Sequence, residues 1–129
     1  MTTTTTGLTT ISLVCLPTPD KDKAVAFYES LGFEKRTDQP FGGGYRWIEV
    51  YPPEGNTGIA LAPPPSDGGP VQPTITGITL NTSDIDATHA AMKELGVDVD
   101  AQVSRMGELV PPMFWFRDPT GHTLMVVES

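Results

Sequence analysis

The feature that most constrains this chain is an internal repeat in which a strand-like run leads into a short helix bounded by Asp and Gly. From Asp20 to Gly32 is 12 positions, and from Asp84 to Gly96 is also 12 positions. Each landmark of the first copy recurs 64 positions later. An internal repeat indicates that one supersecondary unit is built twice, so the fold is expected to consist of two similar modules.

The first copy begins with an apolar, β-favouring run at 11–16, followed by Asp20, a residue type that commonly caps a helix N-terminus. Apolar residues then recur at i, i+3, i+4 and i+7, which predicts a helix that ends at Gly32. This stripe consists of Ala24, Phe27, Tyr28 and Leu31. Glycines and prolines divide the rest of the copy into three predicted strands, at 33–37, 45–51 and 57–62.

The second copy repeats this plan, with a strand at 75–80 and a helix after Asp84 that carries a weaker apolar stripe. Three further strands are predicted at 97–103, 112–117 and 123–127, with a tight turn at 118–121. The fold class is therefore α+β, with two βαβββ modules. We predict one domain that consists of a flexible tail at 1–10, a first module at 11–62, a linker at 63–74 and a second module at 75–129.

Size and charge restrict the classes of partner. A chain of 129 residues can bury a single core, and its apolar runs are far shorter than the ~20 residues of a membrane span. Sixteen acidic and eight basic residues give a net charge of -8, which repels phosphate backbones and anionic membrane surfaces. The single cysteine and the lack of a signal-peptide pattern fit a reducing compartment. We expect a cytoplasmic protein that binds neither nucleic acid nor membranes.

Four short motifs occur in an order that points to a known family. They are Pro19-Asp20 ahead of 24–28, Leu31-Gly32-Phe33, the helix start at 84–87, and the turn at 117–121. With them the chain resembles the vicinal oxygen chelate superfamily, which includes glyoxalase I, the extradiol dioxygenases, and the fosfomycin and bleomycin resistance proteins. The resemblance implies two curved mixed sheets around an open cleft, often in a homodimer that exchanges strands or modules. A homodimer is expected, although a compact monomer would use the same residues.

The resemblance also locates the positions that hold a divalent metal in the metal-dependent members of this superfamily. Those positions fall at Leu13, Ala60, Gly77 and Met125, and none of them supplies the imidazole or carboxylate that such metals favour. Shifting each position by one residue does not bring in such a group. We therefore expect a cleft without a metal and without a cofactor.

The alternation of side chains along strands indicates which residues line the cleft. Ile48 and Val50 should face the helix, which leaves Trp47, Glu49 and Tyr51 toward the cleft. The same alternation predicts that Met113 and Trp115 face the cleft, and Glu108 is expected on a loop near the rim of the cleft. An aromatic residue at strand spacing is also typical of a core, so a structural role for Trp47 stays open. The candidate ligand-binding residues are Leu13, Cys15, Trp47, Glu49, Tyr51, Ala60, Gly77, Glu108, Met113, Trp115 and Met125.

Three residues with reactive side chains receive structural interpretations. Cys15 is interpreted as a small buried hydrophobe, because the sequence places no histidine to activate it. His89 is interpreted as a surface or interface residue on a helix that packs against the convex sheet face. His122 follows a tight turn and is interpreted as a solvated turn residue. No catalytic residue is assigned.

The leading hypothesis is a metal-free protein that sequesters a small organic molecule, aromatic or cationic, as the bleomycin-type antibiotic resistance proteins do. The alternative is an enzyme, a glyoxalase-like lyase or isomerase or a dioxygenase with a non-standard site, in which Glu49 or Glu108 performs acid/base chemistry. A third possibility is a sensor or partner-binding dimer with a vestigial cleft. A superfamily fold by itself does not separate these functions.

Overall fold

The computed structural model describes residues 6–63 and 71–129, so the middle of the predicted linker and the first five residues of the predicted tail lie outside the described residues. The first half contains β1 (Leu13–Pro17), α1 (Lys21–Ser30), β2 (Glu34–Gly42), β3 (Tyr45–Tyr51) and β4 (Gly58–Ala62). The second half contains β5 (Ile75–Thr82), α2 (Ile85–Glu94), β6 (Asp98–Val99), β7 (Met113–Arg117) and β8 (Thr123–Glu128). The predicted βαβββ order is confirmed in both halves.

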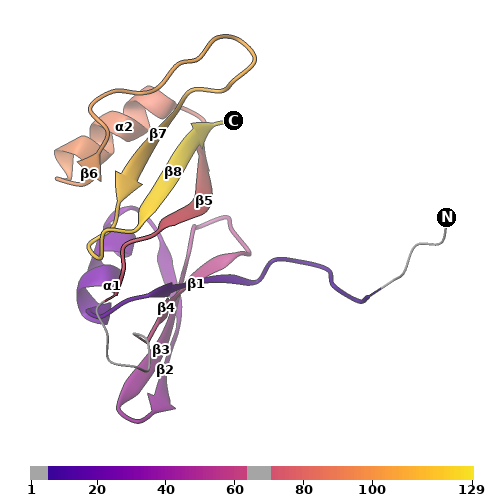
Figure 1. Cartoon of the computed structure of the whole chain (residues 1–129), viewed down its shortest axis with the longest axis vertical. Coiled ribbons are helices and arrows are strands. Elements are labelled where there is room, and N and C mark those ends of the chain that lie inside the picture. The colour runs from indigo at the N-terminus through magenta and orange to yellow at the C-terminus, as the bar shows by residue number, and fades with distance from the viewer. Residues whose placement is uncertain (1–5, 64–70) are drawn as a thin grey trace.

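Each half forms its own four-stranded mixed sheet, and the two sheets have the same topology. The strand order is β1-β4-β3-β2 in the first sheet and β5-β8-β7-β6 in the second. The first strand of each module pairs in parallel with the last, and the remaining pairs are antiparallel. The two sheets follow one another along the molecule, and α1 and α2 cover the same side of both (Figure 1). In the described part of the chain, the opposite side of each sheet carries no helix.

The helix boundaries follow from the capping residues identified in the sequence. The carboxylate of Asp20 accepts a hydrogen bond from the N–H of Lys23 at 3.0 Å, and that of Asp84 accepts one from Ala87 at 3.1 Å. These side chains satisfy backbone donors that the first turn of a helix leaves unpaired. Gly32 and Gly96 adopt φ values of 98° and 81°, a conformation that terminates a helix at little cost only in glycine. The predicted helix ends are thus confirmed.

A single apolar core runs through both modules between the helices and the sheets. The ring of Phe27 on α1 lies 6.3 Å from that of Phe116 on β7, so the first helix also contacts the second sheet. The largest fully buried apolar side chains are Tyr28, Phe114, Phe116, Ile48, Leu61, Ile85, Leu124 and Val50. None of the helices in the described residues is long and apolar enough to cross a membrane.

A buried hydrogen-bond network joins the two modules. The hydroxyl of Tyr28 donates to Asp118 at 2.9 Å, and burial together with that carboxylate raises the pKa of Tyr28. His122 is fully buried: its Nδ1 accepts from the N–H of Thr74, so its Nε2 carries the proton and donates to the carbonyl of Pro17 at 2.9 Å. The interpretation of His122 as a solvated turn residue is therefore wrong. The turn that precedes it packs against the first module.

Strand lengths differ from the sequence prediction at two places. The strand predicted at 97–103 extends only over Asp98–Val99, because the carboxylate of Asp100 accepts a hydrogen bond from the N–H of Trp115 and Arg117 also binds Asp100. Pairing beyond it is limited to a bridge between Ser104 and Met113. In contrast, β2 continues to Gly42 through two register shifts, and the edge of a sheet tolerates its Pro40.

Candidate functional site

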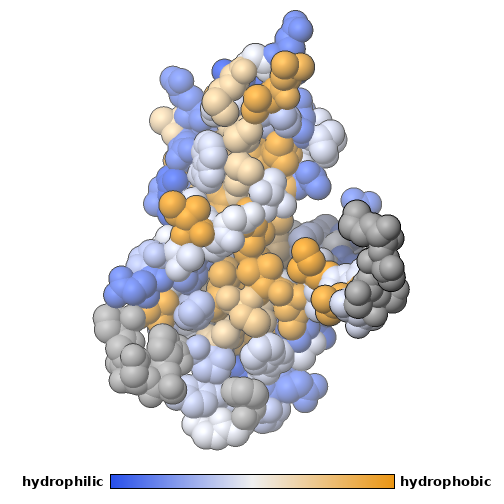
Figure 2. Space-filling model, turned by 45° about the vertical axis from the view of Figure 1, so that its right-hand side comes forward, coloured by the Kyte–Doolittle hydropathy of each residue, from blue (hydrophilic) through white to orange (hydrophobic). Residues whose placement is uncertain are grey.

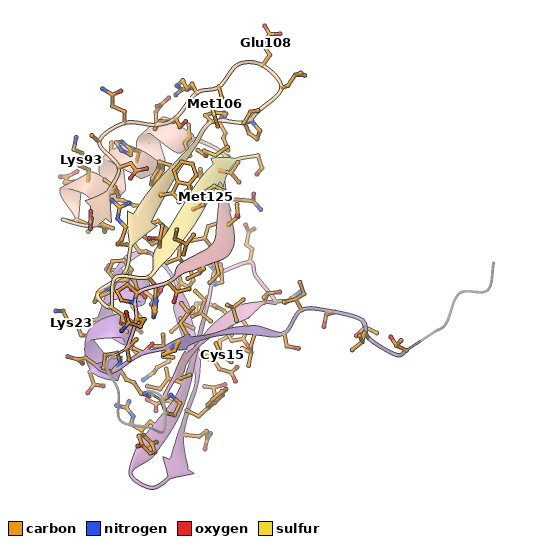
Figure 3. All side chains as sticks on the ribbon, viewed as in Figure 1. Cys15, Lys23, Lys93, Met106, Glu108 and Met125 are labelled. Atoms are coloured by element: carbon orange, nitrogen blue, oxygen red, sulfur yellow. The ribbon has the colours of Figure 1, made fainter. Side chains whose placement is uncertain are left out.

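The predicted cleft residues lie mainly on the side of each sheet that faces away from its helix, which we call the helix-free face. In the first sheet, cross-strand pairing places Glu49, Ala60 and Cys15 in one row across β3, β4 and β1. In the second sheet, Trp115 and Met125 form the corresponding row across β7 and β8. Each half of the chain therefore contributes one half of the predicted binding surface (Figure 3).

Burial confirms the predicted alternation on both central strands. Ile48 and Val50 on β3 are fully buried, whereas Trp47, Glu49 and Tyr51 are only partly buried. On β7, Phe114 and Phe116 are fully buried, whereas Met113 and Trp115 are partly buried. Aromatic and thioether side chains thus reach the surface on the helix-free faces, where their flat or flexible apolar surfaces suit contacts with organic molecules.

The central feature of the first helix-free face is a carboxylate held between two aromatic residues. The indole N–H of Trp47 donates to one oxygen of Glu49 at 2.8 Å, and the hydroxyl of Tyr51 donates to the other at 2.7 Å. The three residues are two positions apart, so their side chains project from the same face of β3. The hydrogen bond to Glu49 raises the pKa of Tyr51, so this hydroxyl stays protonated and continues to donate.

The charged residues near Glu49 form ion pairs with one another. The guanidinium of Arg36 lies 4.5 Å from the centre of the Tyr51 ring and bonds to Glu34. Hydrogen bonds from Arg46 and Lys35 hold the pKa of Asp38 at about 2, well below its usual value. These ion pairs link β2 to β3 and α1, and they support the strand that carries Glu49.

The second helix-free face is more apolar than the first. Met113, Trp115, Met125 and Val127 are each partly exposed on β7 and β8. Arg117 lies at the end of β7, where its guanidinium donates hydrogen bonds to Asp98 and Asp100. These bonds raise the pKa of Arg117, and the two carboxylates balance its positive charge. This face therefore offers apolar contacts, and the first face adds a carboxylate.

Four predicted site residues have surroundings that the sequence did not show. Cys15 is exposed, so its interpretation as a buried hydrophobe is wrong: it lies on an edge strand with its side chain on the helix-free face. Ala60 is fully buried and presents no surface of its own. Gly77 lies where β5 shifts register against β8, with a φ of 74°. Glu108 is exposed on the loop that extends beyond the sheet, and it lies far along the molecule from Cys15 (Figure 3).

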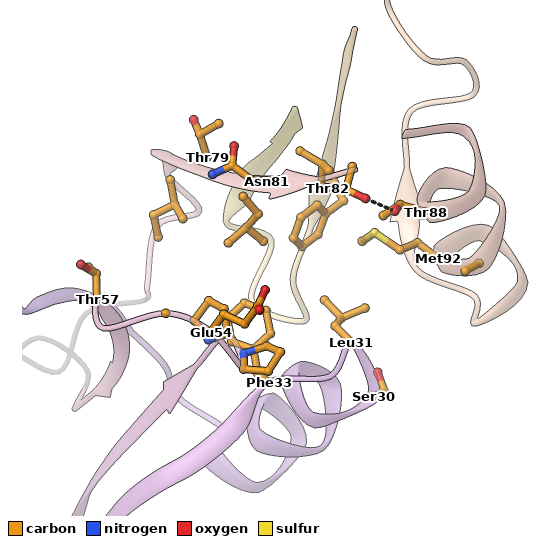
Figure 4. Close-up of a pocket in the computed structure, with 18 of the residues that line it drawn as sticks. Ser30, Leu31, Phe33, Glu54, Thr57, Thr79, Asn81, Thr82, Thr88 and Met92 are labelled. Atoms are coloured by element: carbon orange, nitrogen blue, oxygen red, sulfur yellow. Dashed lines mark hydrogen bonds between the residues drawn. The ribbon is translucent and has the colours of Figure 1, made fainter. Parts of the chain in front are cut away.

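A cavity of about 810 Å³ lies where the two modules meet, and none of the predicted site residues lines it. Five consecutive residues of β5, Ile78–Thr82, border it, and β5 is an edge strand of its sheet in the described residues, so the cavity follows that strand. Its other walls come from α2, the end of α1 and the loop between β3 and β4, and hydroxyls of Thr82 and Thr88 are hydrogen-bonded at 2.7 Å beside it (Figure 4). Apolar side chains gather across the middle of the molecule on the face drawn in Figure 2.

The sequence did not predict this junction cavity, although the apolar stripe of the second predicted helix contains part of its lining. Met92 and Leu95 belong to the apolar stripe of the second predicted helix, yet Leu95 is 56% exposed in the single chain. An apolar helix position that remains exposed indicates a surface that another segment can cover. The alternation of β5 could not show this, because it does not reveal which strand edge stays unpaired.

The positions that correspond to the family's metal ligands do not fit a metal ion. Leu13 and Ala60 belong to the first sheet, Gly77 and Met125 belong to the second, and none carries an imidazole or a carboxylate. Across residues 6–63 and 71–129, no three His, Cys, Asp or Glu side chains are grouped so that they could hold a metal ion. We therefore derive no chemistry through a metal at these positions.

Comparisons with known proteins agree with this architecture. The antibiotic-binding protein TnmS3 from Streptomyces sp. CB03234 is 30% identical, with a TM-score of 0.79 over 96% of this chain and 98% of that one. A superfamily member from Sphaerobacter thermophilus DSM 20745 is 32% identical, with a TM-score of 0.84 over 95% and 98% of the two chains. The uncharacterized protein YurT of Bacillus subtilis (strain 168) is 28% identical over 85% of this chain and 91% of its own length. A family model matches residues 10–126, and the chain therefore belongs to the Glyoxalase/Bleomycin resistance protein/Dioxygenase superfamily.

Proposed function

We propose that this protein binds a small organic molecule on its helix-free faces and acts in the cytoplasm by sequestering it, without a metal or a chemical step. The observation that carries the proposal is the row of partly exposed aromatic and thioether side chains on both faces, with one carboxylate fixed among them. Ligand sites commonly combine apolar walls with a few oriented polar groups. The similarity to an antibiotic-binding protein supports an antibiotic-like ligand.

We further propose that two copies of the chain build each complete cleft. Trp47 and Trp115 lie on separate sheets, so a second copy that brings one sheet opposite the other would enclose a ligand between two aromatic rows. Three features favour a second copy as the partner: the edge of β5 that no strand of the described residues pairs with, the junction cavity beside it, and exposed Leu8 and Ile11 in the segment before β1. That segment ends at the cavity rim, where the hydroxyl of Thr57 donates a hydrogen bond to the carbonyl of Ile11.

Isothermal titration calorimetry against a panel of cationic and neutral aromatic antibiotics tests the binding function. We expect at least one compound to bind with a dissociation constant well below the millimolar range, because two aromatic walls bury much of a flat ligand. Trp47→Ala and Trp115→Ala should each weaken that compound about 10-fold or more. Lys23→Ala, an exposed position on α1, is the matched control and should bind as the wild type does.

Two results of this titration would contradict metal-free binding by this protein. One is the lack of binding of every compound up to millimolar concentration. The other is a loss of binding after dialysis against a chelator, because sequestration on these faces does not depend on a metal. If the two tryptophan variants bind the compound as tightly as the wild type does, the ligand does not bind on the helix-free faces.

A further inference from the structure

Among the residues that the structure describes, Glu49 has no basic partner, whereas the other acidic side chains on the strands of its sheet are paired. On the strands of the first sheet, Glu34 bonds to Arg36, and Asp38 bonds to Lys35 and Arg46. Within residues 6–63 and 71–129, no lysine, arginine or histidine forms an ion pair with Glu49. The charge of this carboxylate is therefore not neutralised by the described part of the chain.

The two hydrogen bonds to Glu49 come from neutral donors, and they fix its orientation. Trp47 and Tyr51 each bind a different oxygen, at 2.8 and 2.7 Å. A carboxylate oxygen can accept two hydrogen bonds, so each oxygen keeps a free acceptor position. Because both aromatic donors hold the carboxylate in place, a ligand that binds it does not have to restrict a mobile side chain.

Glu49 itself is partly exposed, and the row that crosses the sheet from it reaches the surface at Cys15. Across the sheet from Glu49 lie Ala60 and then Cys15, both small, and Cys15 is exposed. The ring of Tyr51 lies directly over Gly58: a Cβ at that position would come within 2.6 Å of the ring. Glycine thus lets the ring of Tyr51 lie over β4 while its hydroxyl reaches Glu49, and Cys15 is the member of the neighbouring row that remains exposed.

A partly exposed carboxylate whose hydrogen bonds come from neutral donors gains a stronger, charge-assisted hydrogen bond from a ligand that carries a positive charge. We propose that Glu49 supplies the charge recognition of the binding site, which therefore selects organic monocations with an aromatic body over neutral molecules of the same shape. This inference rests on the proposed binding function. A protonated amine or amidine nitrogen would donate a charge-assisted hydrogen bond to Glu49, while the aromatic body would lie against Trp47 and Cys15.

Fluorescence titration with two dyes of one shape tests this selectivity. Proflavine is a cation near neutral pH, and acridine has the same three-ring frame but is neutral there. At about 0.15 M salt, where charges are screened beyond about 8 Å, the wild type should bind proflavine about 10-fold more tightly or better. Glu49→Gln should weaken proflavine about 10- to 100-fold and leave acridine within about twofold.

Glu29→Gln is the matched control, because it removes the same charge from an exposed position on α1 and should keep the preference for the cation. If Glu49→Gln does not fold, as its thermal unfolding curve would show, the ratio of the two wild-type affinities decides the question. Equal affinities of the wild type for both dyes would overturn the charge recognition and leave the proposed binding function standing. Failure of the wild type to bind either dye would overturn the inference itself.

Discussion

At the scale of single residues, the junction between the modules depends on Tyr28. Its hydroxyl is the donor to Asp118, whose other oxygen accepts from the N–H groups of Thr120 and His122. Tyr28 is fully buried, so removing its hydroxyl leaves one carboxylate oxygen without this partner. The same turn then brings His122 to the carbonyl of Pro17. One hydroxyl thus supports the contact between two segments that are 90 positions apart.

We therefore expect Tyr28→Phe to lower the free energy of unfolding by about 1–3 kcal/mol, the usual cost of leaving a buried polar group unpaired. Urea denaturation followed by circular dichroism measures this change. Tyr45→Phe is the control, because Tyr45 is 49% exposed, and its stability should stay within about 0.5 kcal/mol of the wild type. Equal stability of Tyr28→Phe and wild type would show that the hydroxyl does not hold the junction.

At the scale of elements, the helices of the two modules have the same type of cap at corresponding positions. Asp20 and Asp84 each accept a hydrogen bond from the backbone three residues later, and each helix then ends before a glycine with positive φ. Since these are interactions within a few residues, they depend little on the rest of the fold. This is why the helix boundaries could be predicted from the sequence, whereas the length of β6 could not.

Asp20→Ala and Asp84→Ala should each destabilise the protein by about 1 kcal/mol, because each leaves first-turn donors without a partner. Thermal unfolding by differential scanning calorimetry measures both variants. Glu29→Ala removes the same charge from the opposite end of α1 and should change the stability by no more than about 0.5 kcal/mol. If Asp20→Ala and Asp84→Ala are as stable as the Glu29→Ala control, the two aspartate caps do not stabilise the helix ends.

At the scale of the whole molecule, the positions of Trp47 and Trp115 on separate sheets underlie the proposal that two copies of the chain build each cleft. Multi-angle light scattering should give a mass about twice the 13.8 kDa of one chain. Replacing both Leu8 and Ile11 by serine should shift the protein toward the monomer, because these side chains are 89% and 72% exposed and would lose their apolar contact with the partner.

Leu109→Ser serves as the control, because Leu109 is 98% exposed on the loop between β6 and β7, away from the junction cavity. This variant should remain a dimer. A monomeric wild type at high micromolar concentration would contradict the proposed assembly and leave each helix-free face as a separate open surface.

The sequence by itself determined the features that depend on near neighbours along the chain. The repeat, the helix caps and the alternation of Ile48 and Val50 with Trp47, Glu49 and Tyr51 all follow from local periodicity and local hydrogen bonds. The element order confirms the repeat, the hydrogen bonds of Asp20 and Asp84 confirm the caps, and burial confirms the alternation. Only the tertiary structure decided the burial of His122, the exposure of Cys15 and the junction cavity along β5. These depend on contacts between segments far apart in the chain, and local patterns do not specify which distant groups meet.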